Sequence, residues 1–170
     1  NVLYCCASFQ YLPTNEESIM AQESRPATVL LVARSFVVKD DRVLMIQRSA
    51  GDRRNPSHWE APGGKLDSGQ DLRDCLDREL SEETKIRVRH VDNIAHYESR
   101  VINDGGPYHG MTYAVLFCIS HIVAGEVELS QEHDAYRWCK YKQMIALVLT
   151  PETRKAAVHL ERRLRRTGVK

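Results

Sequence analysis

The sequence predicts an α/β domain in which a mixed β-sheet lies between helices, and three observations indicate this. Segments rich in β-branched residues recur along the chain and are separated by polar or glycine-containing turns. One amphipathic helix follows a glycine turn in the middle of the chain. A second helix, with a clear start signal, lies near the end. Strands combined with one central and one terminal helix favour a single sheet covered on both faces.

Five segments are expected to form strands because they are rich in β-branched residues or alternate between apolar and polar residues. They span residues 28–38, 43–48, 87–99, 111–124 and 135–139. The first two flank the polar turn at residues 39–42, which predicts a hairpin.

Helical signals close the chain. Residues 140–148 are expected to begin with a helical turn, and Thr150 and Pro151 fit the N-cap and first position of a last helix. That helix should end near residue 166. We expect the domain to span residues 27–168, with residues 1–26 as an extension that is either loose or packed on a neighbouring subunit.

The central helix carries carboxylates where a purely structural helix would carry apolar residues. Its apolar side is marked by Leu72, Cys75, Leu76 and Leu80. At about 100° per residue, Glu79 and Glu83 project into this side and Glu82 lies at its edge. Burying a carboxylate is costly unless it is paired or binds a metal, so these three positions call for a functional explanation.

Spacing narrows that explanation. Residues 79, 82 and 83 are related by i, i+3 and i+4, so their side chains meet on one patch, where like charges repel. A divalent cation removes the repulsion and gains hard oxygen ligands, which is Mg²⁺ or Mn²⁺ chemistry. The alternative is a solvated acidic helix end with Arg78 as its partner. The upstream Gly63-Gly64 favours the metal site, because glycine lets backbone groups approach a ligand closely.

At this point the residues resemble a known family. The signature of the Nudix hydrolases reads glycine-x5-Glu-x7-Arg-Glu-U-x-Glu-Glu-x-Gly-U, with U a bulky aliphatic residue. Its positions are occupied here by Gly64, Gln70, Arg78, Glu79, Leu80, Glu82, Glu83, Lys85 and Ile86. Two of them depart from the pattern. Gln70 replaces the first glutamate, and Lys85 stands where glycine would end the helix in the left-handed conformation, a penalty of about 1 kcal/mol.

The resemblance implies a fold and a chemistry. The fold is an α/β/α sandwich in which a short strand from Trp59 enters the signature. The reaction is hydrolysis of a nucleoside diphosphate linked to another group, with Mg²⁺, or alternatively Mn²⁺, as cofactor. Glu79 and Glu83 would be the principal metal ligands, assisted by Glu82 and by the carbonyl of Gly63.

Further site residues follow less directly. Arg78 would orient an acid through a bidentate contact, and Gln70 removes a carboxylate that assists metal binding or proton transfer in some relatives. Glu132, with Asp134 beside it, is expected to be a further metal ligand or the general base, and Glu60 from the entry strand is a second candidate for the base; each of these acids could instead be structural. Lys65 and Arg48 are expected to contact phosphate, since a polyanion needs cations, although either could be a solvated surface residue.

The signature does not select a substrate. Because marks of other subfamilies are not convincingly placed, we expect the short MutT-like type, which acts on nucleoside triphosphates, oxidised ones included. ADP-ribose or another nucleotide sugar is the alternative, and a nucleotide-binding regulatory module without turnover is the alternative of another class. An RNA-cap hydrolase is a third alternative, but such an enzyme needs a basic groove.

Composition and charge limit the partners and the cellular compartment that we expect for this chain. A net charge of +1 argues against nucleic acid as a partner, and no apolar run is long enough to span a bilayer. The cysteines are odd in number and form no CxxC pair, which predicts neither a disulfide framework nor a zinc site and favours a reducing cytoplasm. Dimers are common in the family, so a homodimer stays open.

Overall fold

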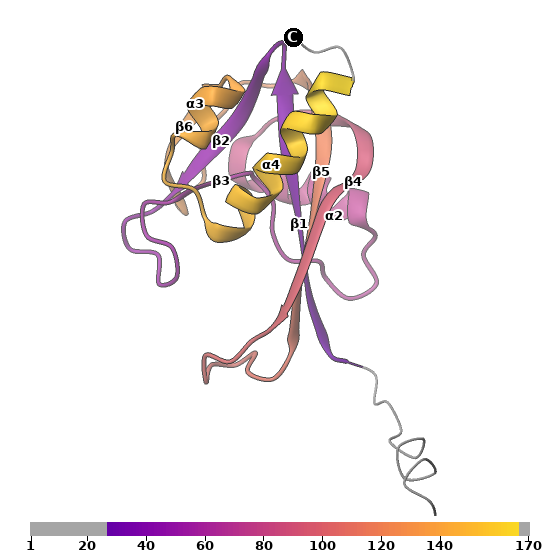
Figure 1. Ribbon diagram of the computed structural model, residues 1–170, viewed down its shortest axis with the longest axis vertical. Coiled ribbons are helices and arrows are strands. Elements are labelled where there is room, and N and C mark those ends of the chain that lie inside the picture. The colour runs from indigo at the N-terminus through magenta and orange to yellow at the C-terminus, as the bar shows by residue number, and fades with distance from the viewer. Residues whose placement is uncertain (1–26, 167–170) are drawn as a thin grey trace, which may run out of the picture.

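The computed structural model describes residues 27–166, apart from the side chains at positions 92, 93 and 162–166. The expected extension at residues 1–26 therefore lies outside the described residues. In chain order the elements are β1 (Val29–Lys39), β2 (Arg42–Arg48), β3 (Trp59–Glu60), α2 (Leu72–Thr84), β4 (Arg87–Val101), β5 (Thr112–Ala124), β6 (His133–Cys139), α3 (Tyr141–Ile145) and α4 (Pro151–Arg166) (Figure 1). Each predicted strand and helix is confirmed, with bounds that differ by at most a few residues.

The strands form one mixed sheet. Its order within the described residues is β3-β2-β1-β5-β4, and β6 pairs with the opposite edge of β2 from β3. The predicted hairpin joins β1 and β2 in antiparallel fashion, whereas β1 and β5 run parallel along the centre. Asp40 turns the hairpin with a positive φ of 54°, a conformation that Asp tolerates better than most residues.

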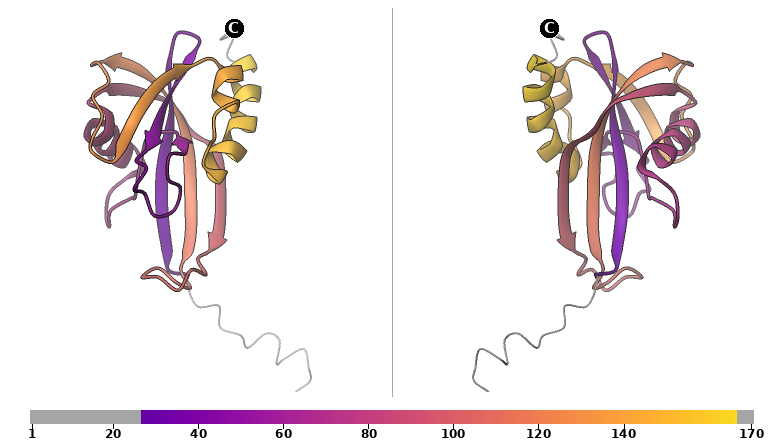
Figure 2. Two further views of the ribbon diagram at one scale, coloured as in Figure 1. Left: turned by 90° about the vertical axis from the view of Figure 1, so that its left-hand side faces the viewer. Right: turned by 90° about the vertical axis from the view of Figure 1, so that its right-hand side faces the viewer.

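Helices cover both faces of the sheet, as the expected sandwich requires. In side view α2 lies on one face, and α3 and α4 lie on the other (Figure 2). Among residues 27–166, none of the helices combines the length and apolar character needed to cross a bilayer.

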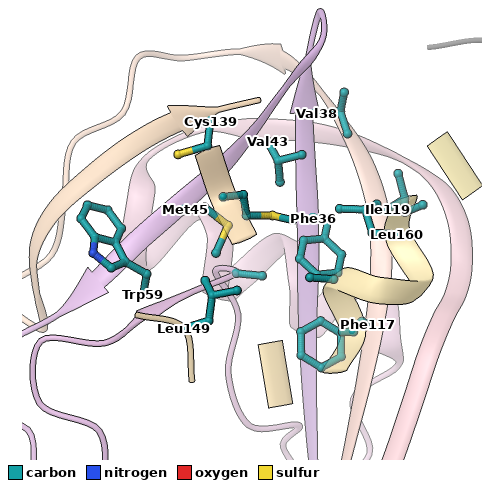
Figure 3. Packing of buried hydrophobic residues seen from close by; sticks show 14 of the residues in the cluster. Phe36, Val38, Val43, Met45, Trp59, Phe117, Ile119, Cys139, Leu149 and Leu160 are labelled. Atoms are coloured by element: carbon teal, nitrogen blue, oxygen red, sulfur yellow. The ribbon is translucent and has the colours of Figure 1, made fainter. Parts of the chain in front are cut away.

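Each helical layer closes its own core. On the side of α3 and α4, Phe36 and Phe117 stack with ring centroids 5.4 Å apart, next to Leu160 of α4 (Figure 3). On the side of α2, Leu76 and Leu80 pack against β1, β2 and β5. The apolar stripe predicted for the central helix is therefore the face that binds the sheet.

The turn that precedes α2 runs along the edge of β1. Backbone N–H groups of Ala33 and Ser35 donate to the carbonyls of Gly64 and Pro62, each at 2.9 Å. Gly63 has a φ of 131°, and a β-carbon there would lie 2.2 Å from the Ala33 carbonyl oxygen. Only glycine fits at this position, because both the backbone conformation and the space exclude a side chain.

Helix α2 has defined ends. The Asp71 side chain accepts hydrogen bonds from the N–H groups of Arg73 and Asp74, which is an N-cap. Lys85 ends the helix at φ 59° and ψ 11°, and its N–H donates to the Ser81 carbonyl. The left-handed conformation expected where the family signature has glycine is thus confirmed.

This conformation predicts that Lys85→Gly stabilises the protein. A left-handed residue with a β-carbon is strained by about 1 kcal/mol relative to glycine, so the free energy of unfolding should rise by about that amount. Urea titration followed by circular dichroism measures the change. Lys85→Ala is the matched control, because it removes the same side chain but keeps the β-carbon. An equal gain in the alanine variant would show that the lysine side chain, rather than the backbone, is the source of strain.

Candidate active site

A cleft of about 430 Å³ opens beside the glycine turn and gathers most of the predicted site residues. Except for Asp134, the expected acids contribute to its lining, and so do both expected cations. The sequence-predicted residues among its lining are Arg48, Glu60, Gly63, Gly64, Lys65, Glu79, Glu82, Glu83 and Glu132. Arg78 and Gln70 were predicted as site residues but are not part of the lining.

Glu83 is the most deeply placed acid of α2. Its side chain is 9% exposed, and its Oε2 accepts a hydrogen bond of 2.7 Å from the Gly63 N–H. Burial raises the pKa of Glu83 to about 7, although His133 and Arg34 attract the ionised form. A carboxylate in this setting gains from an added positive charge.

Glu79 faces the other side of the glycine turn. Its side chain is 14% exposed, and burial raises its pKa against the attraction of Arg78. A β-carbon on Gly64 would lie 2.3–2.5 Å from the carboxyl atoms of Glu79. The missing side chain of Gly64 therefore provides the space that the Glu79 carboxylate occupies. Glu82, by contrast, is 61% exposed at the rim.

Arg78 connects these acids to the turn. Its Nη1 lies 2.9 Å from Glu79 Oε1 and 3.3 Å from Glu82 Oε2. Its Nη2 donates to the Lys65 carbonyl at 2.9 Å and to Gln70 Oε1 at 3.4 Å. One guanidinium thus contacts both acids through a single nitrogen and anchors the segment that leads into α2, rather than gripping one acid with two nitrogens.

Two further arginines bind Glu60, whose side chain is 2% exposed at the end of β3. Glu60 Oε2 lies 2.9 Å from Arg34 Nη2, and Glu60 Oε1 lies 2.7 Å from Arg48 Nη1. Burial opposes ionisation, but Arg34, His133 and Arg48 together hold the pKa of Glu60 below its usual range. With both oxygens in ion pairs, Glu60 is a poor candidate for the general base.

The remaining predicted residues stand at the mouth of the cleft. Glu132 is exposed and lines it, whereas Asp134 accepts a hydrogen bond from the Ala50 N–H at 2.9 Å. Lys65 Nζ lies 5.1 Å from the Tyr108 ring centre. Arg48 also pairs with Asp52, so much of its charge is already compensated within the protein.

Several lining residues were missed by the sequence reasoning. They are Leu30, Val32, Arg34, Arg54, Asn55, Arg100, Tyr113 and Glu152. Arg34 offered a signal, because it is the one charged residue within the apolar segment 28–38. Arg100 and Glu152 offered none, since they come from β4 and α4 and meet only in the fold, at 3.3 Å.

The residues of this cleft fit a divalent cation. Carboxylate oxygens are the ligands that Mg²⁺ and Mn²⁺ prefer, and Gly64 keeps open the space in which Glu79 lies. Within residues 27–166, no three His, Cys, Asp or Glu side chains already stand together as a metal-binding group. Arg78 lies between Glu79 and Glu82, so the acids would have to turn toward a cation.

The chain matches the family model described as NUDIX domain over residues 29–161. Among curated proteins, it is 47% identical over 57 residues to an uncharacterised Nudix hydrolase, YvcI, of Bacillus subtilis (strain 168). That match covers 34% of this chain and about a third (33%) of the relative's length.

Solved structures share the fold. One is the MutT protein of Methanosarcina mazei Go1, with a TM-score of 0.65 and 23% identity, over 82% of this chain and 98% of that one. Another is an Ap4A hydrolase of C. elegans, with a TM-score of 0.62 and 21% identity, over 79% and 97%. At such identities the likeness shows the fold alone, but the family match extends over most of the chain and includes the whole signature. The chain therefore belongs to the Nudix hydrolases, a family of pyrophosphohydrolases whose members typically depend on a divalent metal.

Proposed function

We propose that this protein hydrolyses a pyrophosphate bond of a nucleoside triphosphate, oxidised nucleotides included, with Mg²⁺ as cofactor and Mn²⁺ as a substitute. One observation carries the proposal. Carboxylates of α2 and cations of the sheet and loops face the same cleft of about 430 Å³. Such a site can hold a divalent cation and a polyphosphate at once, and phosphoryl chemistry asks the protein mainly for positioning and charge neutralisation.

Glu79 and Glu83 are the proposed principal ligands, with Glu82 and the Gly63 carbonyl completing the set. The bound cation supplies charge neutralisation of the phosphate oxygens and a lower pKa for the attacking water. The chain itself fixes the ligands. Arg78 forms an ion pair with Glu79, and the Gly63 N–H donates a hydrogen bond to Glu83.

The cations at the mouth are suited to bind the phosphates that the metal leaves uncompensated. Lys65 and Arg54 each contact the loop that joins β4 to β5, through Tyr108 and Asp104. These contacts are exposed, so they are weak and can be exchanged for contacts to phosphate. Arg48 is less available, because Glu60 and Asp52 already bind it.

Glu132 is our candidate for the group that takes the proton of the attacking water. It lines the cleft and is exposed, so its carboxylate can reach a water beside the phosphates. The two ion pairs of Glu60 argue against it in this role.

The substrate is tested with a panel of nucleotides. Purified protein is incubated with Mg²⁺ and nucleoside triphosphates, oxidised triphosphates, dinucleoside polyphosphates, ADP-ribose and nucleotide sugars, and the products are separated by ion-exchange chromatography. The proposal expects the highest kcat/KM for a nucleoside triphosphate. Preference for ADP-ribose or a nucleotide sugar would overturn the substrate, and binding without turnover of any compound would overturn the enzyme.

Glu83→Gln should lose nearly all activity while staying folded. The substitution removes one buried negative charge and keeps the side-chain volume, so we expect kcat to fall by about a hundredfold or more because a principal metal ligand is lost. Phosphate release in a pyrophosphatase-coupled assay measures the rate, and thermal unfolding checks the fold. Glu126→Gln is the control, since Glu126 is exposed and is not part of the cleft lining. Equal losses in both variants would contradict the assignment.

Gly64→Ala should damage the site with little effect on stability. The nearest atoms to the new methyl group would be those of the Glu79 carboxyl group, which must leave its position. We expect the Mg²⁺ concentration for half-maximal rate to rise about tenfold, as for a displaced ligand. Gly51→Ala is the matched control, because a β-carbon at Gly51 meets nothing within 4 Å. An unchanged Mg²⁺ requirement in Gly64→Ala would argue against Glu79 as a ligand.

A further inference from the structure

His133, the first residue of β6, lies buried between two carboxylates. Its side chain is 2% exposed, and its Nε2 is 3.7 Å from Glu60 Oε1 and 3.7 Å from Glu83 Oε1. Glu60 belongs to β3 and is bound by two arginines, whereas Glu83 belongs to α2. The imidazole is thus the link between a fully paired acid and a proposed metal ligand.

The two acids differ in how much freedom they have. Both oxygens of Glu60 are held by arginines, so its carboxylate has a fixed position. Of the two Glu83 oxygens, Oε2 receives a hydrogen bond from the Gly63 N–H. The other oxygen, Oε1, has His133 as its neighbour. The orientation of the Glu83 carboxylate therefore depends on the position of the His133 imidazole.

The backbone around His133 is tied to the end of α2. Within the connection from β5 to β6, the N–H groups of Ser130 and Glu128 donate to the carbonyls of Glu83 and Thr84, each at 3.1 Å. The β2–β6 ladder shifts register between Gln47 and Arg48, which places His133 opposite Arg48. These backbone contacts fix the position of His133 relative to Glu83.

The distances distinguish this histidine from one that serves only the fold. A separation of 3.7 Å is longer than a hydrogen bond, so Nε2 attracts Glu83 Oε1 without occupying its lone pairs. The buried Nδ1 has no hydrogen-bond partner within the described residues. A histidine kept only for stability would be expected to satisfy both ring nitrogens. This arrangement instead aligns a carboxylate and leaves it open to a cation.

We propose that His133 is a positioning residue for Glu83: it couples the Glu83 carboxylate to the fixed Glu60 and so keeps Oε1 directed for metal binding. The inference rests on the proposed function, because it takes Glu83 as a metal ligand. Outer groups that orient ligands typically change metal affinity by about 10- to 100-fold when they are removed. His133→Leu should therefore weaken metal binding by at least about tenfold and leave the nucleotide KM at saturating metal unchanged.

The test compares three variants with the wild type. His133→Leu removes the ring, His133→Gln retains an N–H donor near the position of Nε2, and His133→Asn places its donor near the position of Nδ1. His58→Leu is the matched control, a histidine of the loop before β3 that is not part of the cleft lining. Mn²⁺ affinity is measured without substrate by electron paramagnetic resonance, and the kcat and KM for nucleotide are measured at saturating Mg²⁺. Thermal unfolding reports the fold of each variant.

We expect Mn²⁺ to bind about tenfold more weakly to His133→Leu and His133→Asn, with most of the affinity restored in His133→Gln and none lost in His58→Leu. Wild-type affinity in folded His133→Leu would overturn the inference. Equal affinity in the glutamine and asparagine variants would also overturn it, and this comparison applies even if the leucine variant does not fold. A wild-type protein that binds no Mn²⁺ would instead overturn the proposed function.

Discussion

The active cleft depends on one hydrogen bond, which the Gly63 N–H donates to the buried Glu83 carboxylate at 2.7 Å. It joins the glycine turn to α2, and the turn is itself held against β1 by backbone hydrogen bonds. Because a β-carbon at Gly63 would overlap the Ala33 carbonyl, the turn can lie this close to the sheet only as glycine. The position of the acids in the cleft thus follows from the contact between a strand edge and two glycines.

A buried acid needs compensation, and here it comes from neighbouring side chains on β1, β2 and β6. Arg34 and Arg48 neutralise Glu60, and His133 links Glu60 to Glu83. Removing one member of a buried pair commonly destabilises a protein by about 3–5 kcal/mol, since the remaining charge is left uncompensated. Under the proposed function, this network leaves Glu83 able to gain a cation, because its neighbour His133 lies 3.7 Å from Oε1.

Local patterns in the sequence predicted the strands and the inward direction of Glu79 and Glu83, because periodicity and turn chemistry act over a few residues, whereas the left-handed end of α2 was expected from the family signature. The partners of those acids were beyond such reasoning. His133 meets Glu83 only because β6 pairs with β2 in a register with one shift, and Arg34 of β1 meets Glu60 of β3 only in the folded sheet. Contacts of this kind depend on the register of distant segments, which no local pattern encodes. Glu60 illustrates the limit: its sequence position allowed a catalytic base, and its two ion pairs argue against that role.

The departure from the family signature at Gln70 has a physical consequence in this network. Gln70 Oε1 accepts a hydrogen bond from Arg78 Nη2 at 3.4 Å, next to the Lys65 carbonyl that the same nitrogen contacts. A glutamate there would compete with Glu79 and Glu82 for the charge of Arg78. The neutral amide keeps the hydrogen bond and adds no charge beyond that of Asp67, whose Oδ2 already lies 3.3 Å from the same Nη2, while Nη1 is directed at the two acids of α2. Gln70 therefore lowers the negative charge beside Arg78 by one relative to the family signature and preserves the contacts of Arg78 with Glu79 and Glu82.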